Sequence, residues 1–189
     1  MNTILGVDPG LTRCGLGVVV IDARRNCKML HVEAFTTKPD VELASRISAI
    51  GSRIAQVMDE FKPDVIALER VFAQANLRTV MGTAQISGVV LFLAAQRGIR
   101  VALHTPTEVK AAVTGSGRAA KPQVGAMVAK ILGLKEVPKP ADAADALAIA
   151  ITQAWKPLGV SSNGQGGAAT PAQQAWANAE LASKAKPRR

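Results

Sequence analysis

Residues 3–22, TILGVDPGLTRCGLGVVVID, contain two apolar segments separated by a turn, and they decide how the fold begins. Residues 3–7 form a short apolar run that stops at Asp8-Pro9-Gly10, a combination typical of turns. Residues 15–22 are rich in β-branched side chains and end in a charged turn, and residues 27–37 follow with rough alternation. Three strands joined by short connections predict an antiparallel meander at the start of the chain.

After this meander the apolar residues change to helical spacing. They recur at helical intervals over residues 43–61, with Arg46, Arg53 and Glu60 between them. The segments that we predict downstream are a strand at 64–69, a helix at 76–97, a strand at 101–105 and helices at 106–113, 122–132 and 141–155. This order predicts an α/β fold whose five-stranded mixed sheet has three antiparallel strands, then two parallel ones, with helices on both faces.

The composition bounds the class of protein. The chain has 189 residues, of which 48% are hydrophobic, so a mostly disordered chain is excluded. Its two cysteines cannot form a disulfide framework, its longest apolar run (residues 89–95) is too short to span a membrane, and residues 1–10 do not resemble a signal peptide. We therefore expect a soluble cytoplasmic protein, with no membrane partner, that has one domain at 1–157 and a flexible, basic tail at 158–189.

The chain is basic, with a net charge of +9. Only four of its 23 basic and one of its 14 acidic residues lie in 158–189, so residues 1–157 hold a net charge of +6. Such a domain favours polyanions such as nucleic acid or an anionic membrane surface, although a solvated basic surface would look the same.

Four carboxylates lie where predicted strands end or a helix begins. Asp8 ends the first strand and Glu69 the fourth, while Asp142 and Asp145 share one face at the start of the last helix. Ligand sites of open α/β sheets gather at the carboxyl ends of strands, so Asp8 and Glu69 would meet there if their two strands are parallel neighbours. Each carboxylate alone also has a structural interpretation, as a turn residue, a solvated strand end or a complement to the helix dipole.

Several carboxylates in one pocket need a counter-cation to remain ionised. Oxygen ligands suit a hard ion, which points to Mg²⁺ or Mn²⁺ and away from zinc. His31 and His104 lie in predicted strands, where we expect packed or surface side chains. A basic protein with such a site favours phosphodiester chemistry, in which two metals hold the attacking and leaving oxygens.

Three motifs resemble those of the bacterial RuvC family of crossover junction (Holliday junction) endodeoxyribonucleases. They are residues 4–15 (ILGVDPGLTRCG), 67–72 (ALERVF) and 141–150 (ADAADALAIA), in the family's order and spacing. The resemblance covers residues 3–155. It implies a ribonuclease H-like fold and a homodimer that nicks two strands of a four-way DNA junction symmetrically, in recombination and DNA repair. The expected products are 5′-phosphate and 3′-hydroxyl ends.

The resemblance also implies residue roles. Asp8, Glu69, Asp142 and Asp145 would be catalytic carboxylates for two Mg²⁺ ions per subunit, with Asp8 shared between the ions. Glu69 would serve the metal near the attacking water and the two helix residues the other, and Mn²⁺ would substitute. A branch-migration helicase of the RuvA and RuvB type is the partner that the family implies.

Other residues fit contacts with DNA in the same family. Lys110 and Lys121 match lysines near the scissile phosphate, and Arg118 lies in a segment that resembles the family's basic loop. The alternative is that the lysines are ordinary exposed side chains of a basic protein. Phe72 matches an aromatic that stacks on an unpaired base, or it is a core residue. Residues 80–95 match the family's dimer interface, whereas without the resemblance they would indicate a buried helix of a monomer.

Three other interpretations are weaker. Residues 8–12 also resemble the first phosphate loop of actin-like and sugar-kinase-like ATPases, but the chain is too short for their two domains. Residues 115–120 match a dinucleotide fingerprint without its leading strand. A non-catalytic junction-binding protein on this scaffold is expected to lack the carboxylates, and all four are present.

Overall fold

The computed structural model of the chain describes residues 1–70 and 77–156. The elements, in order, are β1 (Asn2–Asp8), β2 (Arg13–Ile21), β3 (Cys27–Thr36), α1 (Leu43–Phe61), β4 (Val65–Glu69), α2 (Leu77–Gln96), β5 (Arg100–His104), α3 (Pro106–Thr114), α4 (Lys121–Leu132) and α5 (Ala141–Ala154). Their order is the predicted one. One boundary matters for the site, because α4 begins at Lys121 and not after it.

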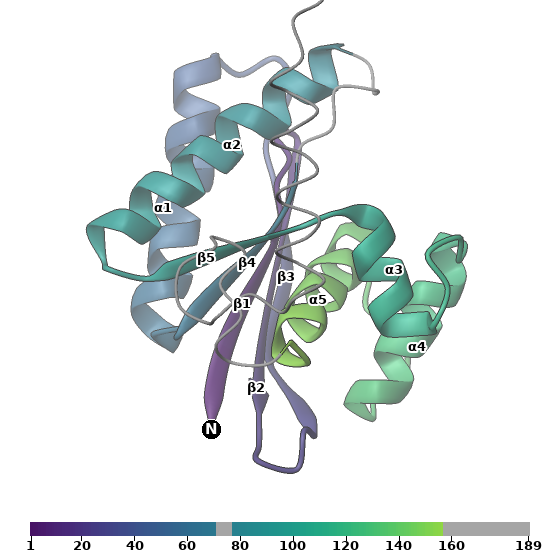
Figure 1. The fold of residues 1–189 in the computed structure, drawn as a ribbon. Helices are drawn as coiled ribbons and strands as arrows, with labels where there is room; N and C mark the ends of the chain where they lie inside the picture. Colours follow the sequence, from purple (N-terminus) through teal and green to yellow (C-terminus); the bar gives the residue numbers. More distant parts are fainter. Residues whose placement is uncertain (71–76, 157–189) are drawn as a thin grey trace, which may run out of the picture. The chain divides into compact units, whose positions relative to one another are not determined.

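The five strands form one sheet in the order β3-β2-β1-β4-β5 (Figure 1). β1, β2 and β3 pair antiparallel, whereas β4 pairs parallel with β1 and β5 parallel with β4. The predicted mixed sheet is therefore confirmed. The parallel pairing places the carboxyl ends of the central strands β1 and β4 at the same edge.

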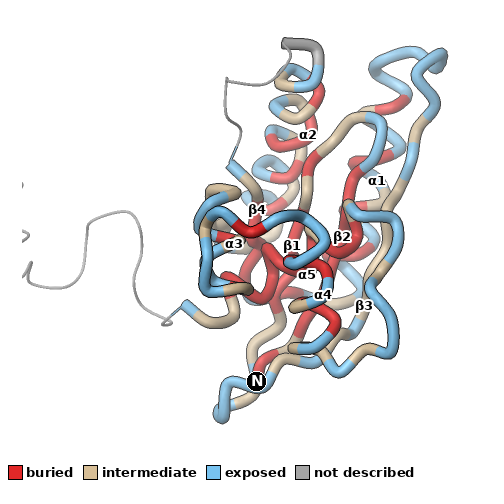
Figure 2. Tube along the Cα trace, turned by 90° about the vertical axis from the view of Figure 1, so that its right-hand side faces the viewer, coloured by how far each residue is buried: buried red, intermediate tan, exposed pale blue. Residues whose placement is uncertain are grey.

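Helices cover both faces of the sheet, as predicted, and each face has its own apolar core. Leu5 and Val7 of β1 pack with α1 and α2 on one face. Ile4 packs with α3, α4 and α5 on the other. Buried residues run along the central strands and α5 in Figure 2, whereas β3 at the edge carries more exposed ones.

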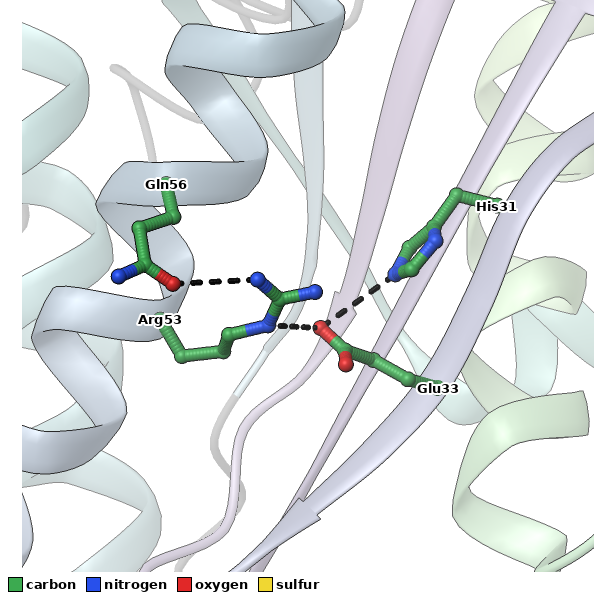
Figure 3. A network of polar contacts seen from close by, with 4 residues as sticks. All are labelled: His31, Glu33, Arg53 and Gln56. Carbon is green, nitrogen blue, oxygen red and sulfur yellow. Dashed lines mark hydrogen bonds and ion pairs between the residues drawn. The ribbon is translucent and has the colours of Figure 1, made fainter.

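A polar network ties the edge strand β3 to α1 (Figure 3). The Arg53 Nε atom donates to Glu33 Oε1 at 2.7 Å, and Arg53 Nη1 donates to Gln56 Oε1 at 3.1 Å. His31 Nε2 lies 3.4 Å from the same Glu33 oxygen, and the His31 ring packs against Phe61. His31 is thus a packed side chain of β3.

α5 lies closer to the sheet than a side chain would allow. A Cβ atom on Gly6 of β1 would come within 2.1 Å of the Ala146 carbonyl oxygen, and one on Gly15 of β2 within 2.1 Å of the Asp142 carbonyl oxygen. Gly15 pairs directly with Asp8 in the sheet. The absence of a side chain at Gly15 therefore sets how near the first turn of α5 lies to Asp8.

We predict that Gly15→Ala pushes α5 away from the sheet. The clash is with backbone, so the expected cost is about 1–3 kcal/mol of the free energy of unfolding, as for other overpacked sites. Urea unfolding measures it. The matched control is Gly51→Ala in α1, whose added methyl meets only a Val89 methyl at 3.1 Å. Equal stability of the two variants would contradict the proposed role of this close contact.

Residues 1–156 form one compact unit. The predicted flexible, basic tail at 158–189 lies outside the described residues, and so does Phe72. Both stay predictions.

Candidate active site

Asp8 and Glu69 meet at the carboxyl edge of the sheet. Val7 of β1 is in register with Leu68 of β4, so the next residue of each strand is a carboxylate and the two are neighbours. Their carboxyl groups lie within hydrogen-bonding reach of each other. We predicted this neighbourhood on the condition that the two strands pair in parallel, and they do.

α5 brings the other two carboxylates to the same place. Asp142 and Asp145 lie in its first turns, three residues apart, and α5 packs across β1 and β2. Both charges act on Asp8 and raise its pKa. The four predicted carboxylates thus converge, although they come from three separate parts of the chain.

Burial and mutual repulsion shift the titration of the central pair. The pKa of Asp8 is raised to about 8, first by burial and then by the charges of Glu69, Asp145 and Asp142 and the hydrogen bond to Glu69. Burial also raises the pKa of Glu69, against the hydrogen bond from Asp8, which lowers it. Without a cation, Asp8 is therefore the member of the pair that holds a proton, and its O–H group donates a hydrogen bond to Glu69.

We predict that the protein without metal loses stability as the pH rises. The pKa of Asp8 is about 8 in the folded state, well above the ordinary aspartate value of 3.8, so the folded state binds the extra proton. Its contribution to stability is present below the unfolded pKa and is lost as the pH rises through the folded pKa. In EDTA, the free energy of unfolding of the wild type relative to Asp8→Asn should fall by a few kcal/mol from about pH 5 to about pH 9.

Urea unfolding of both proteins across this range measures the difference, and the neutral Asn serves as the control for every other titrating group. A difference that stays constant with pH would contradict the raised pKa of Asp8.

Two basic side chains pair with the helix carboxylates. Lys121 Nζ lies 2.9 Å from Asp145 Oδ2, and Arg13 Nε lies 3.0 Å from Asp142 Oδ2. Lys121 was predicted for the site from the family resemblance, whereas Arg13 was only part of a quoted motif. The signal that could have found Arg13 is its position at the start of β2, on the same turn as Asp8.

Two hollows adjoin at Asp8 and Lys121, which line both. The larger cleft, of about 700 Å³, is also lined by Arg13, Arg46 and Asp142, by the turn after Asp8 and by Thr79 and Thr83 of α2. The smaller cleft, of about 300 Å³, is lined by Glu69, Asp145 and Lys110 among others. Lys110 therefore lines the same cleft as Glu69 and Asp145, and its contact with DNA stays a prediction.

The donor set suits a hard cation, because it offers only carboxylate oxygens. Within the described ranges, no three acidic, histidine or cysteine side chains stand close enough together to hold an ion as they are. Asp142 and Asp145 are turned to Arg13 and Lys121 instead. The residues fit Mg²⁺ by chemistry, and binding it requires these two carboxylates to exchange a protein cation for the metal.

The structure also places the remaining basic residues that the sequence singled out. Arg118 is exposed in the loop between α3 and α4 and lines neither cleft. His104 is fully buried, with Nε2 3.0 Å from Gln153 Oε1, and burial lowers its pKa, so it is a packed neutral side chain and not a ligand. Arg46, which helical spacing placed among the polar positions of α1, is buried beside the larger cleft.

Comparison with known proteins identifies the family. The family model described as crossover junction endodeoxyribonuclease RuvC matches residues 4–153, which is most of the chain. The chain belongs to the RuvC family. It is accordingly a crossover junction endodeoxyribonuclease, and the resemblance drawn from the three motifs is confirmed.

Relatives and solved structures agree with this assignment. A crossover junction endodeoxyribonuclease RuvC of Leifsonia xyli is 54% identical over 94% of this chain and 91% of its own length. One of Streptomyces avermitilis is 61% identical over 81% of this chain and 87% of its own. The RuvC of Thermus thermophilus, solved in complex with a Holliday junction substrate, is 38% identical and superposes with a TM-score of 0.77 over 82% of this chain and 93% of that one.

Membership in the RuvC family decides against the ATPase interpretation of residues 8–12. The fold extends further than the family, because a yeast mitochondrial Holliday junction resolvase at 14% identity still superposes with a TM-score of 0.56 over 80% of this chain. At that identity the likeness shows the shared fold alone.

Proposed function

We propose that this chain resolves four-way DNA junctions by hydrolysing one phosphodiester bond in each of two opposing strands, which leaves 5′-phosphate and 3′-hydroxyl ends. The observation that carries the proposal is the convergence of Asp8, Glu69, Asp142 and Asp145 at one sheet edge of a RuvC-family protein. A junction in two-fold arrangement presents two equivalent strands, so a two-fold enzyme with one such site per subunit suits paired nicking.

The four carboxylates are the proposed ligands of two Mg²⁺ ions, for which Mn²⁺ would substitute. When bound, these ions supply a Lewis acid that activates water and neutralises charge on the leaving oxygen. Asp8 feels the charge of all three other carboxylates, which supports its role as the ligand shared between the ions. Glu69 would hold the ion near the attacking water, and Asp142 and Asp145 would hold the other.

Basic and aromatic side chains are the proposed contacts with DNA. Lys121 touches Asp145 and lines both clefts, which places a positive charge where the scissile phosphate would lie. Lys110 would hold the strand in the smaller cleft, and Arg118 would contact the backbone farther out. Phe72 keeps its predicted role in stacking on an unpaired base.

The outer face of α2 supports a homodimer. Met81, Leu91 and Phe92 are exposed large apolar side chains, and small or apolar residues at helical spacing continue the stripe between them. The opposite face is packed, with Ile86, Val90 and others in the core. We propose that a second copy of the chain covers the exposed stripe.

The same helix raises a membrane interpretation. Of the described helices, α2 contains a segment, Thr79–Gln96, that is long and apolar enough by length and composition to cross a bilayer. This is weak evidence, because one face of α2 packs into the core shared with α1 and the sheet. A stripe on one side fits a partner helix better than lipid on all sides.

We predict that Phe92→Glu separates the subunits. A charge placed within the proposed apolar interface loses its hydration without gaining a partner, so the dissociation constant of the dimer should rise by about 100-fold or more. Sedimentation of the dimer over a concentration range measures this. The matched control is Leu30→Glu, at an exposed apolar residue of β3. A wild type that remains monomeric at every concentration would overturn the dimer.

The decisive experiment is strand cleavage of a synthetic four-way junction with Mg²⁺ and with EDTA, against a linear duplex of the same sequence. Metal-dependent, paired nicks on the junction are expected, and the labelled ends report a 5′-phosphate and a 3′-hydroxyl. Equal cleavage of the duplex would contradict structure specificity, and unchanged cleavage in EDTA would contradict the metal. A branch-migration helicase of the RuvA and RuvB type remains the proposed partner, in the bacterial cytoplasm.

A further inference from the structure

Arg46 is a buried cation held in one orientation. It lies in the first turn of α1 and is 9% exposed. Its Nε donates to Thr37 Oγ1 at 2.9 Å, and its Nη2 donates to Thr12 Oγ1 at 2.9 Å and to the Leu11 carbonyl at 3.3 Å. Thr37 Oγ1 in turn donates to the Leu11 carbonyl at 2.6 Å. The guanidinium is therefore fixed against the turn that follows Asp8.

All the acceptors around Arg46 are neutral. Over residues 1–70 and 77–156, Arg13, Arg53 and Arg97 each pair with a carboxylate, whereas no acidic side chain pairs with Arg46. Burying a charge without a counter-ion is costly, and hydrogen bonds to hydroxyl and carbonyl groups offset only part of that cost. An anion that reaches Arg46 would supply the counter-charge that the neutral acceptors do not.

The larger cleft gives an anion that access. Arg46 lines this cleft of about 700 Å³ together with Asp8 and Asp142, so the buried cation and the candidate catalytic carboxylates face the same space. Thr79 and Thr83 of α2 line it as well and offer hydroxyl donors. A nucleic-acid strand whose reacting phosphate lies at Asp8 would have to continue into a neighbouring hollow, and this is one of the two that adjoin there.

We propose that Arg46 binds the backbone phosphate next to the scissile one on the strand that is cut. The inference rests on the proposed function and adds a phosphate subsite to it. The hydrogen bonds described above use the Nε and Nη2 atoms of Arg46, which leaves the two N–H groups of Nη1 to donate to a phosphate. The fixed orientation of the guanidinium would then set the register of the strand over the carboxylates. Arg46 is then a positioning residue that touches the substrate one nucleotide away from the reaction.

The test combines a protein variant with a chemical change in the DNA. Junctions are prepared in which one phosphate at a time, on either side of the scissile position, is replaced by an uncharged methylphosphonate. Affinity is measured in EDTA, so that no strand is cut, for the wild type, for Arg46→Gln and for Arg46→Lys. The control is Arg100→Gln, at an exposed arginine at the start of β5, the opposite end of that strand from the site.

One neutralised phosphate next to the scissile one should weaken binding to the wild type by about 10-fold. Arg46→Gln should lose about the same affinity on unmodified DNA, lower the salt slope by about 1, and show no further loss on that modified junction. Arg46→Lys should recover part of the loss, because it keeps the charge without the two-donor geometry. Arg100→Gln should still respond to the modification.

Three results would overturn the phosphate subsite. In the first, the affinity lost through Arg46→Gln and the affinity lost through the methylphosphonate add independently. In the second, the wild type binds equally well whichever phosphate beside the scissile one is neutralised. In the third, Arg46→Gln lowers the stability of the protein without changing its affinity for DNA. If Arg46→Gln fails to fold, the same comparison of modified and unmodified junctions is made with Arg46→Lys. The binding of the wild type to the series of modified junctions needs no variant at all. Failure of the proposed function looks different, because the wild type would then neither bind nor nick the unmodified junction.

Discussion

Asp8→Asn is expected to abolish strand cleavage while the protein still binds the junction. The substitution keeps the size of the side chain and removes the carboxylate that feels the charge of all three others, so the proposed metal site would lose its shared ligand. We expect the single-turnover cleavage rate to fall by at least about 10³-fold, since groups that act as a unit fail together. Affinity in EDTA should stay within about threefold, because Asp8 holds a proton without a cation and the substitution therefore removes no charge that faces the phosphates.

The measurement pairs single-turnover nicking in Mg²⁺ with anisotropy binding in EDTA on the same junction. Asp59→Asn is the matched control, because Asp59 is an exposed carboxylate of α1 whose partner is Arg97, away from both clefts at the site. A parallel loss of binding and cleavage in Asp8→Asn would make Asp8 a structural residue. Full activity would remove it from the mechanism.

The sheet and the carboxylate cluster could be predicted because local patterns determine both. Alternating and β-branched runs predicted the strands, and the ends of β1 and β4 carry Asp8 and Glu69 directly. Only the pairing of β1 with β4 remained to be supplied by the structure. Without family motifs, nothing local to α5 tells that Asp142 lies near Asp8, because this proximity depends on the missing side chain at Gly15 in a distant strand.

Arg46 and α2 show where local pattern fails. Helical spacing assigned Arg46 to the polar positions of α1, but the turn after Asp8 and Thr37 fold over the first turn of that helix and bury it. The apolar stretch of α2 fits a buried helix or an interface equally well, since burial against the sheet and burial against a second subunit need the same residues. The exposed Phe92 separates these two possibilities, and the sequence alone does not show that exposure.

The charge of Lys121, rather than a proton that it transfers, is expected to act on the reaction. Without metal, its hydrogen bond to Asp145 raises its pKa, and the charges of Asp145, Asp8 and Asp142 add to this. Where Asp145 turns to a metal instead, we expect the ordinarily high pKa of a lysine to keep Lys121 protonated near neutral pH. A permanent ammonium beside the scissile phosphate stabilises negative charge that develops in the transition state. It cannot serve as a general base, which needs a pKa near the working pH.

We therefore predict that Lys121→Ala lowers the single-turnover cleavage rate by about 10²-fold or more and the junction affinity by about 10-fold or less. The control is Lys130→Ala, at an exposed lysine in the last turn of the same helix. Lys121→Arg should recover part of the rate, because it keeps the charge, and the pH dependence of the rate should keep its midpoint in Lys121→Ala. A shifted midpoint would mean that Lys121 gives up or takes a proton. A loss of affinity larger than the loss of rate would make it a simple backbone contact, with charge compensation in the transition state left to the metal and to Lys110.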